Sequence, residues 1–173
     1  ISGNQRISNG ITSDQQYWQA PLGRLTNLWE FFYNKRIGML MAHRKVFEEA
    51  ESYTEAIKML SEIPLLSPVY YIVSGTKSNE GIIIEMDRDG PVGSIELNIE
   101  TGRWFLVQTN YDRDVPDPLT DDRRTAAEDR LQEIGRSSID GDKILNDVLA
   151  RYPNLNSITI ESVVFSAQEN YFN

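Results

Sequence analysis

The sequence predicts a layered α+β domain in which an antiparallel meander is flanked by helices. Large apolar residues recur at helical spacing in the first third of the chain, four short β-type runs follow between residues 69 and 109, and helical spacing returns after residue 122. This order of helices, strands, helices and a last strand is typical of an α+β fold. The chain has 173 residues, of which 40% are hydrophobic, so we expect one domain with a substantial core.

The first helical region is unusually rich in aromatic residues. Residues 14–47 predict one long helix or two consecutive helices with a break near Gly38. Their apolar stripe, which includes Trp18, Trp29 and Phe32, is wider than one core-facing side requires. Such a stripe is most often core, but this density also suits an acyl-chain cleft or contact with a lipid surface.

Three further helices are predicted from caps and periodicity. Ser52 and Glu55 have the spacing of a capping box, which predicts a short helix over residues 53–61. Apolar residues at helical spacing predict two more helices, over about 122–134 and 141–151.

Five strands are predicted from alternating or continuous apolar runs bounded by turn-forming residues. Short connections between the first four of them indicate an antiparallel meander. The first two strands are largely apolar, so we expect both faces of the sheet to be covered. The predicted strands are 69–73, 81–86, 92–97, 103–109 and 157–165.

Composition excludes several classes of function. The formal charge of −9 and the isoelectric point near 4.6 argue against a nucleic-acid-binding protein, which needs a basic face. The chain contains no cysteine, so it offers no disulfide, no thiolate–metal site and no cysteine nucleophile of its own. We expect no metal site and no cofactor. The acidic stretch from Asp112 fails the EF-hand pattern, because Pro116 occupies its fifth position and Arg123 replaces the glutamate of its twelfth.

His43 is the only histidine, and it lies in a basic helical stretch with no adjacent acid. We therefore interpret it as a solvated or helix-end histidine rather than a catalytic one.

The strongest candidate for chemistry is the pair Asn110 and Arg123. Asn110 follows an apolar run, and Arg123 stands with Arg124 where a helix should begin, although the positive end of a helix dipole disfavours cations. Amide and guanidinium groups are suited to holding an oxyanion or a carboxylate. A structural alternative remains open, in which Asn110 satisfies loop backbone and Arg123 pairs with Asp121, Asp122 or Asp112.

Several motifs resemble those of a known enzyme family. They are Val69-Tyr-Tyr-Ile-Val-Ser-Gly-Thr76, Asp87-Arg-Asp-Gly-Pro91, Gly102-Arg-Trp-Phe105, Thr109-Asn-Tyr-Asp112 and Asp121-Asp-Arg-Arg-Thr125. Over nearly the whole chain and in the same order, they resemble the β-subunit of the lysosomal acid amidases, the family of N-acylethanolamine-hydrolysing acid amidase and acid ceramidase.

The resemblance implies an N-terminal-nucleophile hydrolase with an αββα sandwich. In that family a proenzyme cleaves itself into α- and β-subunits, and the N-terminal cysteine of the β-subunit attacks a fatty-acyl amide lipid. Matched onto this sequence, Asn110 corresponds to an oxyanion-hole or substrate-orienting residue, and Arg123 to an arginine at the rim of the active site. The resemblance also implies substrate-binding roles for Tyr111 and for the aromatic residues Trp18, Trp29 and Phe32.

Two departures from the family pattern qualify these expectations. The family's cysteine lies upstream of Ile1, so we interpret residues 1–173 as a single partial domain, the C-terminal part of an amidase β-subunit without the nucleophile segment. The family has a glutamate where this chain has Gln5, which cannot take up a proton or carry charge. The main hypothesis is therefore part of a lysosomal amide hydrolase, with Gln5 among its catalytic residues. Gln5 also supports an alternative, an inactive pseudo-amidase or lipid-interaction module of the same fold; an unrelated α+β domain is a third hypothesis.

Overall fold

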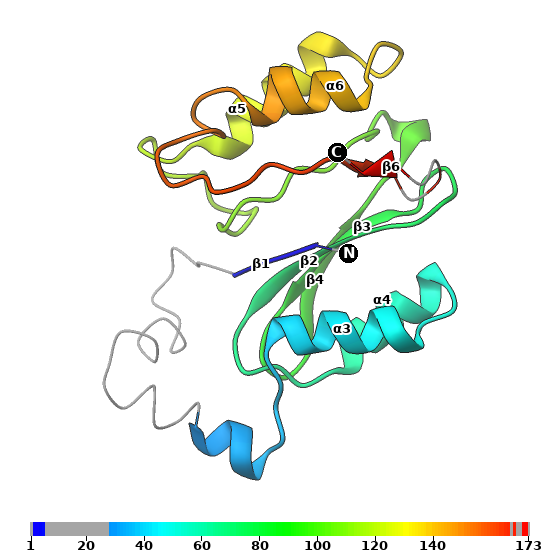
Figure 1. The fold of residues 1–173 in the computed structure, drawn as a ribbon, viewed down its shortest axis with the longest axis vertical. Coiled ribbons are helices and arrows are strands. Elements are labelled where there is room, and N and C mark those ends of the chain that lie inside the picture. The colour runs from blue at the N-terminus through cyan, green and yellow to red at the C-terminus, as the bar shows by residue number, and fades with distance from the viewer. Residues whose placement is uncertain (1, 6–27, 167, 169–170, 173) are drawn as a thin grey trace.

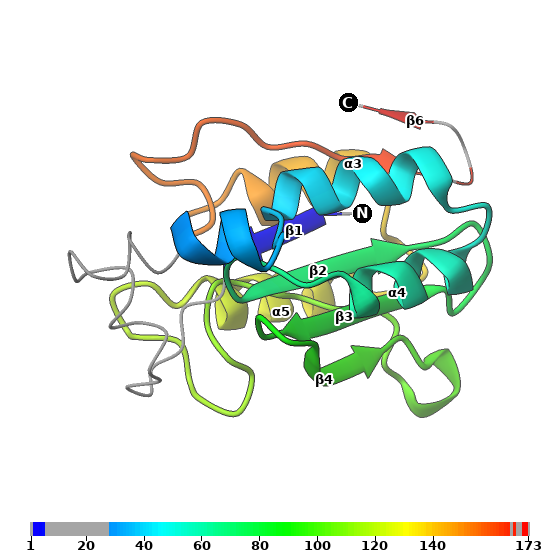
Figure 2. The same ribbon diagram turned by 90° about the horizontal axis from the view of Figure 1, so that it is seen from below.

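A computed structural model describes residues 2–5, 28–166, 168 and 171–172 of the chain. The described residues form stacked layers, which Figures 1 and 2 show from two directions. Helices α3 (Met39–Glu49) and α4 (Tyr53–Glu62) cover one face of an antiparallel sheet. Extended chain between residues 103 and 122 lies beyond the other face, and helix α5 (Arg123–Ile134) packs outside that chain (Figure 1). The layered α+β prediction is confirmed.

The sheet has four strands in the order β1–β2–β3–β4, and each strand is antiparallel to its neighbours. The pairing of β2 with β3 runs from Val69 opposite Met86 to Ser74 opposite Gly81. The meander from β2 to β4 was predicted, whereas β1 was not; it pairs with β2 from a distant part of the sequence. The strands are β1 (Ser2–Gln5), β2 (Val69–Ser74), β3 (Gly81–Met86) and β4 (Pro91–Glu96).

Alternate residues of β2 serve two different layers. Val69, Tyr71 and Val73 pack in one core cluster with residues of α3 and α4. Tyr70 is equally buried, but its hydroxyl reaches Asp112 in the layer beyond the opposite face. The sheet is therefore covered on both faces, as its apolar strands predict.

The helix signals are largely confirmed. The Ser52 hydroxyl accepts a hydrogen bond from the Glu55 backbone N–H at 3.2 Å, so α4 begins where the capping box predicts. The Glu55 carboxylate accepts from the backbone N–H of Glu51, at 2.9 Å, and not from that of Ser52. Residues 28–33 are helical and α3 starts directly after Gly38, which confirms the predicted break.

The last predicted helix contains a change of winding. A short α-helix, α6 (Gly141–Lys143), continues into a π-helix over Ile144–Leu149. The Ala150 N–H donates to the Leu145 carbonyl at 2.8 Å, which is the wider hydrogen-bond spacing of a π-helix. The predicted apolar face is present, because Val148 packs against α5 residues.

Two predicted strands are not strands over most of their length. After β4 the chain turns through the 3₁₀ turn Ile99–Thr101 and Gly102, and only Arg103 forms a bridge, with Asn98. Trp104, Phe105 and Val107 pack against α5 residues, but no described strand pairs with the backbone of residues 104–109. Of the predicted strand 157–165, only Phe165 is in a strand, as part of β5 (Phe165–Ser166), which pairs with β6 (Tyr171–Phe172). An apolar pattern in the sequence predicts that side chains are buried. It does not predict whether the backbone finds a neighbouring strand to pair with, which a strand also requires.

His43 is not at a helix end, as its sequence context suggested. It lies in the middle of α3, half-buried, with its ring centroid 5.2 Å from that of Tyr71. Its Nε2 atom and the Tyr71 hydroxyl are both buried without a hydrogen-bond partner among the described residues. Burial lowers the pKa of His43 below its ordinary value, because the charged imidazolium is poorly solvated there.

The lowered pKa of His43 predicts that the folded protein loses stability in acid, and that replacing His43 reduces this loss. Between pH about 6.5, the ordinary pKa of histidine, and the lower folded-state pKa, the unfolded chain binds more protons at His43 than the folded chain does. The free energy of unfolding therefore falls as the pH falls through that interval. We expect His43→Leu to reduce the difference in unfolding free energy between pH 8 and pH 5, measured by urea denaturation of the full-length protein that carries this sequence. Lys45→Leu, an exposed neighbour, is the control; equal pH dependence in both variants would contradict the assignment.

Candidate active site at the Asn110 loop

Hydrophobic packing brings the two ends of the Asn110 loop together. Trp104, Phe105 and Val107 pack with Ala127 and Leu131 of α5, so the chain entering the loop is fixed along the helix that leaves it. The loop runs from Asn110 to the start of α5 at Arg123. The polar loop from Asn110 to Arg123 is thus held at one end of the apolar interface between residues 104–107 and α5.

Arg123 contacts Asn110 directly. Its Nη2 atom donates to Asn110 Oδ1 at 3.0 Å. The same guanidinium holds both carboxylate oxygens of Asp121, through Nε at 2.7 Å and Nη2 at 3.0 Å. The structural interpretation is therefore present, because Arg123 pairs with Asp121. The same guanidinium also binds Asn110, while the role of the two residues in chemistry stays a prediction.

The contact sets the orientation of the Asn110 amide. A guanidinium carries only donors, so the side-chain atom that it binds must be the carbonyl oxygen. The amide nitrogen Nδ2, which is a donor, then points to the other side of the Asn110 side chain. An amide donor with a fixed direction is what an oxyanion-binding group requires.

Tyr111 lies beside this pair. Its hydroxyl donates to Asp121 Oδ2 at 3.0 Å, so Asp121 links Tyr111 and Arg123. Burial and the Asp121 carboxylate raise the pKa of Tyr111, which keeps the hydroxyl protonated as a donor. The structure thus brings together three of the residues that the sequence singles out.

A second set of side chains, Thr109, Asp117 and Arg124, binds the buried side of the loop. The sequence predicted no role for these residues. Arg124 Nη2 donates to the backbone carbonyls of Tyr111 and Asp112, each at 3.0 Å, and to the Asp117 carboxylate. Asp117 also accepts from the Thr109 hydroxyl at 2.8 Å. The signal that could have identified this set is Arg124 itself, a second arginine at the positive end of a helix.

These groups are buried. Thr109, Asp112, Asp117 and Arg124 are each no more than 8% exposed. Asp122 caps α5 by accepting from the Thr125 N–H at 3.2 Å. Aspartates therefore surround the two arginines at this helix start and offset the unfavourable dipole.

The other predicted site residues lie elsewhere or outside the description. Trp18 lies outside the described residues. Trp29 and Phe32 are 56% and 67% exposed on the helical segment 28–33. Gln5 ends β1 opposite Val69, next to the β2 residue Tyr70 that binds Asp112, so its backbone lies at the end of the sheet nearest the Asn110 loop.

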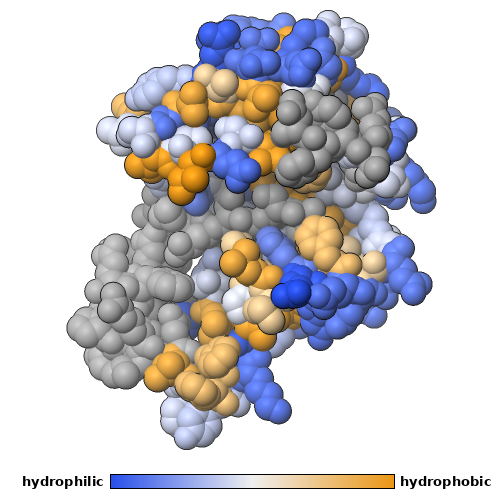
Figure 3. Space-filling model, in the orientation of Figure 1, coloured by the Kyte–Doolittle hydropathy of each residue, from blue (hydrophilic) through white to orange (hydrophobic). Residues whose placement is uncertain are grey.

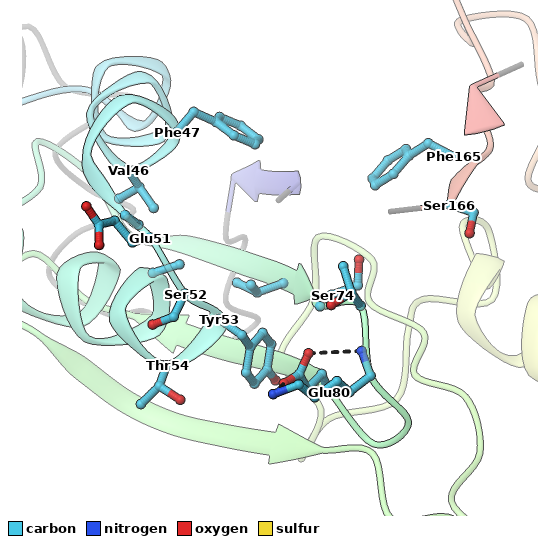
Figure 4. Close-up of a pocket in the computed structure, with 16 residues that line it drawn as sticks. Val46, Phe47, Glu51, Ser52, Tyr53, Thr54, Ser74, Glu80, Phe165 and Ser166 are labelled. Atoms are coloured by element: carbon cyan, nitrogen blue, oxygen red, sulfur yellow. Dashed lines mark hydrogen bonds and ion pairs between the residues drawn. The ribbon is translucent and has the colours of Figure 1, made fainter. Parts of the chain in front are cut away.

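The described chain also has an open cavity of about 830 Å³ at the other end of β2. As Figure 4 shows, Val46 and Phe47 of α3, the start of α4 and the β2–β3 turn surround it, with Phe165 opposite. Of the predicted site residues whose side chains the structure describes, none lines this cavity. Three residue steps along β2, roughly 10 Å, separate its Val73 wall from Tyr70. Its described lining thus lies apart from the Asn110 loop.

Metal ligation and membrane spanning can be assessed for the described part of the chain. Within residues 2–5, 28–166, 168 and 171–172, no group of three His, Asp or Glu side chains is placed to hold a metal ion. No helix in that part is long and apolar enough to cross a bilayer.

Comparison with known proteins identifies the class to which this arrangement belongs. The chain is 42% identical over 167 residues to N-acylethanolamine-hydrolyzing acid amidase of Oryctolagus cuniculus, covering 96% of this chain and 43% of that protein. It is 35% identical over 173 residues to acid ceramidase of Pan troglodytes, covering 99% of this chain and 41% of that protein. The solved structure of the Caenorhabditis elegans ortholog of N-acylethanolamine-hydrolyzing acid amidase superimposes with a TM-score of 0.72 at 34% identity, covering 92% of this chain and 62% of that one. No family model matches the chain.

The fold is therefore the α+β fold of the N-terminal-nucleophile amide hydrolases, present in part. Within that class, the chain belongs to the family of N-acylethanolamine-hydrolyzing acid amidase and acid ceramidase. The chain spans less than half the length of these two relatives. The resemblance stated from the motifs is confirmed, whereas the roles of individual site residues stay predictions.

The buried network predicts a measurable cost for a small change at Thr109. Thr109→Val keeps the shape of the side chain but removes the hydroxyl that donates to the buried Asp117 carboxylate. We expect the free energy of unfolding to fall by about 1–3 kcal/mol, the usual cost of an unsatisfied buried polar group. Urea denaturation of the full-length protein measures it, with Thr54→Val on exposed α4 as the control. A change no larger than that of the control would contradict the network.

Proposed function

We propose that the full-length protein carrying this sequence hydrolyses linear fatty-acyl amides, of the N-acylethanolamine or ceramide class, to a fatty acid and an amine. The observation that carries the proposal is the Asn110 amide, whose oxygen is held by Arg123 at 3.0 Å, which fixes the direction of its nitrogen. Identities of 42% and 35% to proteins named for these substrates support it.

The residues would divide the work as follows. A cysteine at the N-terminus of the mature subunit, in a segment outside this cysteine-free chain, attacks the amide carbonyl. Its own α-amino group accepts the thiol proton, so no histidine is needed. Asn110 Nδ2 stabilises the negative oxygen of the tetrahedral intermediate, the amine leaves, and water hydrolyses the acyl-enzyme. The α-subunit of the same proenzyme is the proposed partner, and the lysosome the proposed location.

The direct test compares the full-length protein with two variants on a fluorogenic fatty-acyl amide at acidic pH. Asn110→Asp keeps an acceptor for Arg123 but cannot donate to an oxyanion, so we expect kcat to fall about 10²–10³-fold. Asn146→Asp, on an exposed helix surface, is the matched control and should retain activity. We expect no turnover by residues 1–173 alone.

The outcome also distinguishes the alternative, a pseudo-amidase, which Gln5 favours. Turnover by the unmodified full-length protein supports the enzyme. If that protein is inactive while Gln5→Glu restores hydrolysis, the natural protein is a pseudo-amidase. Equal rates for Asn110→Asp and the control would remove Asn110 from the mechanism.

A lipid surface is a further proposed partner, because the substrate resides in membranes. Apolar side chains are exposed on residues 28–33 and on α3. Figure 3 shows apolar surface across the lower half of that view, interrupted by polar residues. A chain of net charge −9 gains little from anionic headgroups, so apolar insertion would dominate binding. The exposed residues are Leu28, Trp29, Phe31, Phe32, Tyr33, Leu40, Met41 and Phe47.

Vesicle sedimentation tests this surface. With phosphatidylcholine vesicles, we expect the double substitution Trp29→Ser and Phe32→Ser to weaken binding at least about tenfold, since each buried aromatic contributes roughly 1.5–3 kcal/mol. Ile160→Ser, which changes a fully exposed apolar residue in another segment, is the control. Equal binding by both proteins would place the contact elsewhere or nowhere.

A further inference from the structure

The backbone around Asn110 is held by groups that do not touch the Asn110 side chain. Arg124 Nη2 donates to the carbonyl oxygens of the next two residues, Tyr111 and Asp112, at 3.0 Å each. The same nitrogen binds the carboxylate of Asp117. One guanidinium nitrogen therefore contacts three oxygens of the loop that follows Asn110.

The residue that precedes Asn110 is tied to the same group. Thr109 donates its hydroxyl proton to Asp117 Oδ2 at 2.8 Å, while Arg124 binds Asp117 Oδ1. Asp117 thus joins the chain before Asn110 to the guanidinium that holds the chain after it. We call Thr109, Asp117 and Arg124 the loop clamp.

A fourth contact fixes the clamped loop to the sheet. The hydroxyl of Tyr70 binds Asp112 Oδ1, and Tyr70 is completely buried in β2. Across the strand pairing, Tyr70 lies between Asn4 of β1 and Glu85 of β3, and the preceding residue Val69 pairs with Gln5. Asn110 is consequently positioned relative to the strand end that carries Gln5.

Position and orientation of the Asn110 amide are controlled by different residues. Arg123 sets the orientation, because it binds the side-chain oxygen. The clamp sets the position, because it holds the flanking backbone. Both matter, since a donor that is fixed before the reaction costs no reorganisation, and a displacement of about 1 Å can cost about 10²-fold in rate.

We propose that Arg124 is a positioning residue of the hydrolytic site, acting with Asp117, Thr109 and Tyr70 to fix the Asn110 peptide for oxyanion binding. This inference rests on the proposed hydrolytic function. Arg124 does not touch the substrate; it acts through Asn110. Its burial, at 8% exposure, separates it from Arg123 at the rim.

Arg124→Lys is the most informative substitution. Lysine retains the positive charge that balances the buried Asp117 carboxylate, so this carboxylate is not left as an unpaired buried charge. Its nitrogen, however, is one bond closer to the backbone than Nη2 and cannot reach all three oxygens unless the loop moves by about 1 Å. Arg130→Lys, an exposed residue of the same helix paired with Glu133, is the matched control.

Kinetics on the full-length protein separate positioning from simple destabilisation. We expect Arg124→Lys to lower kcat by about 10–100-fold with KM changed less than about twofold, because the lost interaction belongs to the transition state. Binding of a fatty aldehyde, which forms a tetrahedral adduct, should weaken in parallel with kcat, while binding of the product fatty acid should not change. Tyr70→Phe, which removes only the hydroxyl, should show the same pattern more weakly.

Other outcomes overturn the inference. A kcat equal to that of Arg130→Lys, or an equal loss of aldehyde and fatty-acid binding, would mean that Arg124 is merely structural. If the unmodified protein proves inactive, the proposed function fails, and the clamp is then judged by hydrogen exchange of residues 108–117. Exchange about tenfold faster in Arg124→Lys than in Arg130→Lys supports the clamp; equal exchange rejects it.

Discussion

The pleat of β2 is the constraint on which the described structure depends. Successive residues of a strand point to opposite faces, so Tyr71 enters the core beneath α3 and α4 while Tyr70 reaches Asp112 beyond the other face. A register shift of one residue would turn Val69 and Val73 away from the core beneath α3 and α4 and towards the layer that holds the Asn110 loop. The apolar core and the candidate site therefore share one register.

Two arginines at the start of α5 are unfavourable for the helix, and neighbouring aspartates compensate for them. Two consecutive arginines oppose the helix dipole. Asp121 binds Arg123, Asp117 binds Arg124, and Asp122 caps the helix. The acidic connector, which resembles a metal-binding stretch in composition, thus serves mainly to neutralise two guanidinium groups whose remaining donors hold the Asn110 loop.

Local signals in the sequence predicted the elements that depend on local physics. The Ser52 cap, the break at Gly38 and the β2–β4 meander were all predicted correctly, because caps, turns and apolar periodicity act over a few residues. The strand predicted at 103–109 was wrong, since its apolar side chains pack on α5 without a pairing neighbour among the described strands. The pair Asn110 and Arg123 was predicted, but the clamp around it was not. Tyr70 and Asp112 are separated by 42 residues, and only the folded chain brings them together.

We propose above all that Asn110 is held in advance as a donor for a developing oxyanion. A crystal structure of the full-length protein with a fatty aldehyde bound as a tetrahedral adduct tests it most directly. We expect Asn110 Nδ2 about 2.7–3.1 Å from the adduct oxygen, with Arg123 still bound to Asn110 Oδ1. An adduct oxygen farther than about 3.5 Å from Nδ2, or an Asn110 amide turned so that its oxygen faces the adduct, would contradict it.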